Sequence, residues 1–342
     1  MKYRLSVLIG AVCYGILSTI VVTAYGEGYG LGEVVGSQLL VGFALSWALV
    51  GAMKGIGRRR KSKALRFGSN VDTDSANSSD SALEDGGGRT AFDSESPKLT
   101  WKHRFYLMAA GMPTAVTGLL YYQSLRYIPN SLAILLLFQF TWIGVLLQAV
   151  IQRKKPSGTM LLALAVLFGG TLLAAGVFEE GLTRFDWLGV AFGLLSAVSY
   201  SLFILLSGKA VPKAPAAVRS GWMVTGGMLL VFALFPPTFL FDGQLWNGLL
   251  GYGTLLGFFG AFLPPVLYAI GVPHIGEGMT GILGASELPV AVMLSAVVLH
   301  EQVSLLQWAG VALVLAGVAL PELFKAIKQA SGRPLSGRRL GM

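Results

Sequence analysis

Residues 121–170 read YYQSLRYIPNSLAILLLFQFTWIGVLLQAVIQRKKPSGTMLLALAVLFGG, and residues 268–317 read YAIGVPHIGEGMTGILGASELPVAVMLSAVVLHEQVSLLQWAGVALVLAG. The two stretches align without a gap, with a tyrosine at the start and a glycine at the end of each. A shorter pair of stretches also matches nearer the start of each copy, where Tyr14 falls on Tyr200. Repetition on this scale predicts a chain built from two related halves.

The composition places the chain in a membrane. Apolar residues make up 54% of the 342 residues, charged residues make up 13%, and the mean hydropathy is +0.66. A soluble protein of this length needs more polar surface. The net charge is +9, and the basic residues that cause it lie between the apolar runs. Orientation in a membrane explains this excess better than a nucleic-acid partner does. Cys13 is the only cysteine, which excludes a disulfide framework or a thiolate metal site.

Ten apolar runs are long enough to cross about 30 Å of hydrocarbon. Because a bilayer offers no water to the backbone, each run is expected to be helical. The eighth run is the least regular, since Pro264, Pro265 and several glycines oppose a straight helix. The runs cover residues 5–25, 31–53, 104–125, 129–152, 159–178, 187–208, 218–240, 247–272, 278–299 and 303–324.

The distribution of lysine and arginine between the runs predicts the orientation of the chain. With a cytoplasmic N-terminus, nearly every basic loop lies inside, and the opposite side receives only Arg126 and Arg184. Each half then holds five runs, an odd number, so the second half is inverted relative to the first. We therefore predict an all-α integral membrane protein of the cell membrane, with ten transmembrane helices in two inverted five-helix repeats and both termini cytoplasmic.

The first run also fits a cleavable signal peptide, because Lys2 and Arg4 precede its apolar stretch. Its match to the sixth run favours retention, since removal would unbalance the two halves.

The repeats predict the domain organisation. Residues 1–56 form helices 1 and 2 of the first repeat, residues 104–180 form its helices 3 to 5, and residues 181–325 form the second repeat. Residues 57–103 contain many Ser, Asp and Gly residues and too little apolar surface to fold, which predicts a disordered cytoplasmic loop. A tolerated insertion and a regulatory segment both fit this loop. Residues 326–342 form a basic cytoplasmic tail.

The end of the second half carries a recognisable pattern. The stretch Gly284-Ala-Ser-Glu-Leu-Pro-Val-Ala-Val is followed by Leu299-His-Glu301 and then by Gln307-Trp-Ala-Gly310. These residues resemble the EamA-like branch of the drug/metabolite transporter superfamily, whose repeats typically close with a Glu and a Pro in one span and a Gly-Glu pair at its end. The chain departs from that pattern at His300 and in its first half, which lacks the acids. The resemblance implies a secondary transporter of small organic metabolites, amino-acid-like or drug-like, that exports its substrate.

Glu287 lies near the middle of the ninth run, where an ionised carboxylate costs about 2.5 to 3.5 kcal/mol. Such a group is expected to face a wet cavity, to find a partner or to stay protonated. We therefore expect it to bind substrate and to couple a proton or cation; a structural carboxyl near Pro289 is the alternative. Other polar side chains within the runs would leave hydrogen-bonding groups unmet against lipid, which places them around a central cavity. The candidate substrate-binding residues are Tyr14, Gln38, Tyr121, Gln139, Trp142, Tyr200, Tyr268, Ser286 and Glu287.

Four prolines, Pro113, Pro264, Pro265 and Pro289, are the candidate hinge or kink positions. The histidines are scattered and no phosphate-binding loop occurs, so we expect no metal, no cofactor and no enzyme activity. The expected partners are a small-molecule substrate, the lipid bilayer and a coupling proton or cation, without nucleic acid. A passive channel or sensor and a membrane enzyme acting on a lipid-like substrate are the alternative functions.

Overall fold

The computed structural model describes residues 2–68, 99–153, 158–174, 186–211, 214–267 and 286–330, together with Gly271, His274 and Leu283. These residues are helical or lie in the turns between helices, and none of them is in a strand. Most of the predicted loop (69–98) and of the predicted tail (331–342) lies outside the described residues.

The longer helices follow the apolar runs, because an apolar segment in a bilayer must satisfy its backbone groups internally. Three short helical turns, η2 (Thr238–Leu240), η3 (Leu245–Leu249) and η4 (Gly257–Phe262), accompany α10. The longer helices are α1 (Lys2–Gly26), α2 (Leu31–Gly68), α3 (Trp101–Ser124), α4 (Asn130–Leu137), α5 (Phe140–Gln152), α6 (Gly158–Ala174), α8 (Trp187–Lys209), α9 (Ala216–Leu234), α10 (Leu250–Leu256), α12 (Glu287–Val298) and α13 (Leu305–Ala330).

Within the described part of the chain, four helical segments are long and apolar enough to cross a membrane. Shorter apolar helices accompany them, among them Glu287–Val298 and Leu305–Gly317. The predicted class, an all-α membrane protein, is therefore confirmed. The four long segments are Lys2–Gly26, Leu31–Gly55, Ala217–Leu234 and Leu245–Leu267.

The fourth predicted run, 129–152, forms two helices rather than one. α4 ends at Leu137 and α5 begins at Phe140, so the chain bends at Phe138 and Gln139. Side chains compensate the backbone at this break: Gln139 Nε2 donates to the Leu135 carbonyl at 2.8 Å, and Ser201 Oγ donates to the Phe140 carbonyl at 3.0 Å. A break within a bilayer is tolerated where such groups meet the freed carbonyls.

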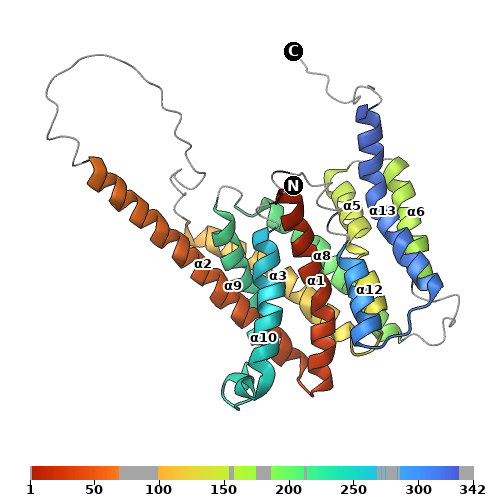
Figure 1. The fold of residues 1–342 in the computed structure, drawn as a ribbon, viewed down its shortest axis with the longest axis horizontal. Helices are drawn as coiled ribbons and strands as arrows, with labels where there is room; N and C mark the ends of the chain where they lie inside the picture. Colours follow the sequence, from red (N-terminus) through yellow and green to blue (C-terminus); the bar gives the residue numbers. More distant parts are fainter. Residues whose placement is uncertain are drawn as a thin grey trace.

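The second predicted run continues further than expected. α2 extends to Gly68 and so includes the first residues of the segment predicted to be a disordered loop. Lysine and arginine make up half of residues 57–68, and both have high helix propensity, so the helix continues after the apolar stretch has ended. Figure 1 shows this end of α2 projecting beyond the neighbouring helices.

The eighth predicted run is one helical segment, but it is not regular. The segment Leu245–Leu267 is kinked within η3 at Asn247 and Gly248, where Gly248 has a φ of 112°, and it contains the wider π-helical turn η4 at 257–262. Pro264 lies two residues after the end of η4, and a proline removes one backbone donor from the helix. A wider turn beside a proline accommodates the lost hydrogen bond.

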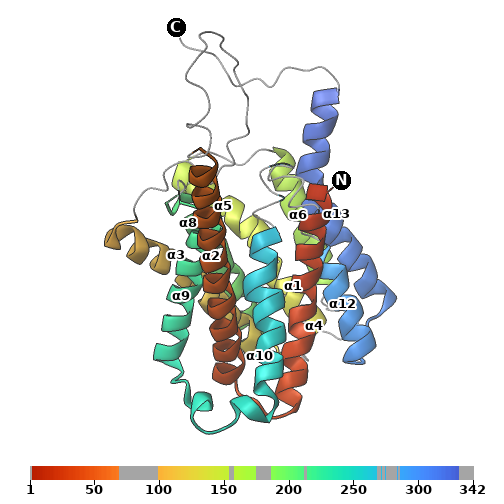
Figure 2. The same cartoon turned by 60° about the vertical axis from the view of Figure 1, so that its left-hand side comes forward.

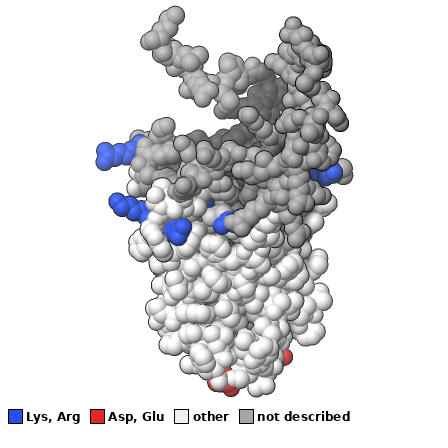
Figure 3. All heavy atoms as spheres, turned by 90° about the vertical axis from the view of Figure 1, so that its left-hand side faces the viewer, with Lys and Arg blue, Asp and Glu red and all other residues white. Residues whose placement is uncertain are grey.

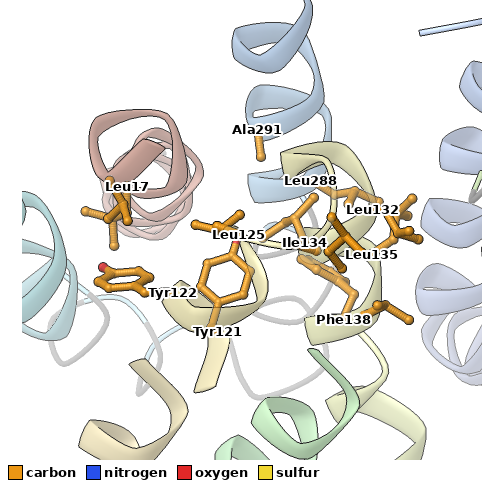
Figure 4. Packing of buried hydrophobic residues seen from close by; sticks show 14 of the residues in the cluster. Leu17, Tyr121, Tyr122, Leu125, Leu132, Ile134, Leu135, Phe138, Leu288 and Ala291 are labelled. Carbon is orange, nitrogen blue, oxygen red and sulfur yellow. The ribbon is translucent and has the colours of Figure 1, made fainter. Parts of the chain in front are cut away.

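The helices pack in groups that mix the two halves of the sequence. α3 packs against both α8 and α9, α2 packs against α9, α10 and η4, and α1 packs against α12 (Figures 1 and 2). α6 and α13 form a pair at one side of the molecule. The buried core lies where α1, α3, α4 and α12 meet, and Figure 4 shows Leu17, Tyr121, Ile134 and Leu288 converging there.

Charged side chains separate toward opposite ends of the molecule. On the face shown in Figure 3, Lys and Arg lie toward the upper end, Asp and Glu lie at the lower end, and the band between them carries neither. In the same vertical direction, α1 begins and α13 ends at the upper end (Figure 1). We call these the basic end and the acidic end. An uncharged middle band is what a hydrocarbon layer requires.

Candidate functional site

A cavity of about 320 Å³ opens among helices from both halves of the chain. α3 contributes one face to it, since residues 114, 117, 118, 121 and 122 follow the spacing of one helix face. Aromatic side chains dominate the lining, and two charged groups join them. The lining includes Tyr14, Leu17, Val35, Gln38, Leu39, Thr114, Thr117, Tyr121, Tyr122, Phe138, Phe140, Tyr200, Phe203, Arg219, Ser220, Met223, Gly260, Pro265 and Glu287.

Glu287 is the acid of this cavity. It is the first residue of α12, half-buried, and its side chain forms part of the lining. Gly15 lets α1 approach this helix end: a Cβ at Gly15 would lie 2.7 Å from the Glu287 carbonyl oxygen. A side chain at position 15 would therefore push α12 away from α1. In the part of the chain that the structure describes, no donor is hydrogen-bonded to the Glu287 carboxylate.

Three of the predicted tyrosines also line the cavity. Tyr200 is held by Phe140, with ring centroids 4.7 Å apart and edge-on, and by Phe203 at 6.0 Å. Tyr121 is only 6% exposed, and its hydroxyl has no hydrogen-bond partner among the described residues. Tyr121 and Tyr200 both lie within electrostatic reach of Glu287. Tyr14, Tyr121 and Tyr200 therefore line the same cavity as Glu287.

Gln38 brings an amide into the same space. Its side chain lines the cavity from α2, and its Oε1 atom is buried without a hydrogen-bond donor among the described residues. Gly260 of η4 lies directly against it, because a Cβ there would lie 2.9 Å from Gln38 Nε2. The π-helical turn of η4 thus places a glycine where the amide needs room.

The other predicted site residues lie elsewhere. Gln139 is buried and donates to Thr171 Oγ1 at 2.7 Å, while its Oε1 accepts from Trp142 Nε1 at 2.6 Å. Both side chains therefore connect α5 to α6 and do not line the cavity. Ser286 Oγ donates to the Leu283 carbonyl at 2.6 Å. Tyr268 lies outside the described residues.

The four candidate kink prolines have different surroundings. The Pro113 carbonyl accepts from Ser199 Oγ and from Thr117 Oγ1, each at 2.8 Å, which joins α3 to α8. Pro265 lines the cavity, and Pro264 precedes it after η4. Pro289 is the third residue of α12, where a missing backbone donor costs nothing because the first turn has no acceptors for its donors.

Sequence reasoning missed Arg219 as a cavity residue. It lies in the first turn of α9 and lines the cavity together with Ser220. The signal that could have identified it is its position one residue inside the apolar run 218–240, where a cation needs a polar environment.

Glu301 connects the two halves of the chain at the start of α4. Its Oε1 accepts from the Asn130 backbone N–H at 2.6 Å, and its Oε2 accepts from the Ser131 N–H at 3.2 Å. Asn130 Nδ2 donates to Ser295 Oγ at 2.6 Å. An acid of the second half thus caps the N-terminus of α4 in the first half. Its negative charge also interacts favourably with the positive end of the helix dipole there.

The fold and the cavity define an all-helical membrane protein with a solute-sized internal chamber. Among the described residues, no group of three His, Cys, Asp or Glu side chains is arranged to hold a metal ion. The model of the EamA-like transporter family matches residues 187–321, which confirms the predicted resemblance to that family.

Two further comparisons agree with that match. A curated relative from Archaeoglobus fulgidus, described as an uncharacterized transporter, is 29% identical over 191 residues. The match covers 56% of this chain and 66% of that relative. A protein of known crystal structure shares 16% sequence identity with a TM-score of 0.59, over 94% of this chain and 98% of that structure. This likeness shows the fold alone.

Proposed function

We propose that the protein is a secondary transporter of small organic solutes and that it exports them. The observation that carries the proposal is the cavity itself, because α1, α2 and α3 of the first half and α8, α9 and α12 of the second half all line it. A site at the interface of two repeats is the usual arrangement in secondary transporters. The similarity to transporters, rather than to enzymes, supports the same class. The outward direction follows from the family resemblance.

The architecture that we propose is ten spans in two inverted repeats in the cell membrane, with both termini cytoplasmic. The separation of charge in Figure 3 supports this orientation, since lysine and arginine are enriched on the cytoplasmic side of membrane proteins. α1 begins and α13 ends at the basic end (Figure 1), which supports a cytoplasmic location for both of these helix ends.

The lining of the cavity supports a substrate with an amine or other cationic group and an apolar body. Glu287 offers a negative charge, and the faces of Tyr14, Tyr121 and Tyr200 offer the cation–π surface that organic cations prefer. Arg219 on α9 offers a charge of the opposite sign for an acidic group on the same solute. Amino-acid-like and drug-like amines meet these requirements. Glu287 is also the proposed group for coupling transport to a proton or a cation.

The mechanism that we propose is alternating access between the two ends. A second hollow of about 780 Å³ lies at the acidic end and is lined by Glu33, Gln123 and Arg126, among others. Between the two hollows, the Tyr25 hydroxyl donates to the Tyr122 carbonyl at 3.2 Å, and the Arg126 guanidinium lies 4.5 Å from the Tyr25 ring centroid. If this contact opened and the basic end closed, the cavity would become accessible from the acidic side of the membrane instead of the basic side.

The test is counterflow in proteoliposomes with a panel of labelled amino acids and aromatic amines. A carrier exchanges labelled for unlabelled solute, a channel shows no acceleration by unlabelled solute, and an enzyme changes its substrate chemically. We expect saturable exchange for at least one amine-bearing solute. Absence of exchange across the panel by a folded protein would contradict the proposal.

Glu287→Gln tests the acid within this proposal. We expect the exchange rate to fall at least about 10-fold, because the carboxylate charge is lost while the size of the side chain is kept. Asp242→Asn is the matched control, since Asp242 is exposed at the acidic end and far from the cavity lining. Wild-type exchange by Glu287→Gln would remove this residue from the mechanism.

A further inference from the structure

A third hollow, of about 450 Å³, lies among α2, α3 and α9. None of its lining residues lines the substrate cavity. Two of them are cationic, Lys54 and Arg104, and two are tryptophans, Trp47 and Trp222. We call this hollow the basic groove.

Arg104 is held in place by aromatic rings. Its guanidinium carbon lies 4.9 Å from the ring centroid of Trp101 and 5.4 Å from that of Trp222. Its Nε atom is buried and has no hydrogen-bond acceptor among the described residues. A guanidinium that is fixed by stacking and lacks an acceptor is prepared to bind an anion.

The tryptophans form a rigid wall beside these cations. The Trp47 and Trp222 rings meet edge-on at 5.2 Å, and Trp47 Nε1 donates to Thr225 Oγ1 at 3.1 Å. Deeper along α3 and α9, Leu107 and Met223 belong to a small buried apolar cluster with Trp222 packed against it. The lining of the basic groove itself adds apolar side chains to the cations and tryptophans, namely Val50, Met53, Leu99, Ala217 and Val218.

Cations beside apolar side chains are what the headgroup and the acyl chains of a phospholipid require. On the face shown in Figure 3, the Lys and Arg side chains lie toward the upper end, above the uncharged band. Tryptophan prefers the headgroup level, and basic pockets between helices on the cytoplasmic side bind phosphate-bearing headgroups. A free anion would use the cations but would gain nothing from the apolar side of the groove.

We propose that the basic groove binds one anionic phospholipid, with its phosphate at Arg104 and Lys54 and its acyl chains against the apolar part of the lining. The site depends on the membrane setting of the chain and not on the identity of the transported solute.

The experiment measures the melting temperature of the purified full-length protein during titration with dioctanoyl phosphatidylglycerol or dioctanoyl phosphatidylcholine. The variants are Arg104→Gln and Lys54→Gln. Lys102→Gln is the matched control, because Lys102 is exposed on the same helix as Arg104 and does not line the groove. Inorganic phosphate and glycerol phosphate are titrated separately to distinguish a lipid from a free anion.

We expect phosphatidylglycerol to raise the melting temperature of the wild type more than phosphatidylcholine does, because a ligand that binds the folded state stabilises it. Removal of each groove charge should raise the concentration for half-maximal stabilisation about 5-fold, and Lys102→Gln should leave it unchanged. Equal stabilisation by the two lipids, an equal loss in Lys102→Gln, or full stabilisation by either free phosphate would overturn the proposal. If Arg104→Gln fails to fold, the same comparison between Lys54→Gln and Lys102→Gln decides it.

Discussion

Single residues join the two halves of this chain. Glu301 comes from the second half and accepts from two backbone donors at the start of α4 in the first half. Asn130 completes the contact through Ser295 of α12, which is fully buried. Four residues from two segments, 130–131 and 295–301, thus meet at one point, where the Glu301 carboxylate serves both backbone donors.

Replacement of Glu301 by alanine should therefore destabilise the protein. Loss of the cap leaves the Asn130 and Ser131 donors unpaired, which costs about 1 to 2 kcal/mol by analogy with other helix caps. The measurement is thermal unfolding of the purified protein in detergent. Gln302→Ala is the control, since Gln302 is the exposed neighbour. Equal melting temperatures for the two variants would show that the cap contributes nothing.

At the acidic end, a few side-chain contacts connect the ends of neighbouring helices. Tyr25 at the end of α1 contacts Tyr122 of α3 through its hydroxyl and lies under Arg126, just after α3. Nearby, Tyr252 of α10 donates to Glu27 at 2.7 Å, which fastens the turn after α1. Tyr122 lines the cavity and Arg126 lines the hollow at the acidic end, so the Tyr25 contacts join residues of these two spaces.

Arg126→Gln should weaken this closure. A cation–π contact at an exposed site contributes about 0.5 to 1 kcal/mol, so its loss should increase access to the cavity from the acidic end about 2- to 5-fold. Access is measured by the rate at which an impermeant maleimide, added from that end, labels Ser220→Cys in a Cys13→Ser background. Arg126→Lys keeps the cation and should retain most of the closure. A rate that is identical in all three backgrounds would show that Arg126 does not gate the cavity.

The two ends of the molecule differ in charge, one basic and one acidic on the face shown in Figure 3. This difference is the basis of the proposed orientation in the membrane. Lys54 and Asp242 are exposed at the basic and the acidic end, respectively. The uncharged band between the ends in Figure 3 has no charged side chain that would resist a bilayer.

Single cysteines at these two positions test the orientation in intact cells. In a Cys13→Ser background, Asp242→Cys should react with an impermeant maleimide added outside, and Lys54→Cys should react only after the membrane is permeabilised. The opposite pattern would invert the proposed topology. Labelling of both without permeabilisation would exclude a membrane between them.

The sequence by itself determined the helical membrane class, because apolar runs of this length leave the backbone no other way to satisfy its donors and acceptors in lipid. It also indicated Tyr14, Gln38, Tyr121, Tyr200 and Glu287, since polar groups in such runs need a shared polar space, and the structure places all five at one cavity. Their role in substrate binding stays a prediction.

Only the tertiary structure decided which polar residues share that space. Gln139 and Trp142 bond to each other and to α6, while Arg219 turns out to line the cavity. The sequence could not separate these cases, because a periodic pattern fixes the face of a helix but not the neighbour that the face meets. Likewise, the break between α4 and α5 and the cap from Glu301 depend on donors and acceptors that come from segments far apart in the chain.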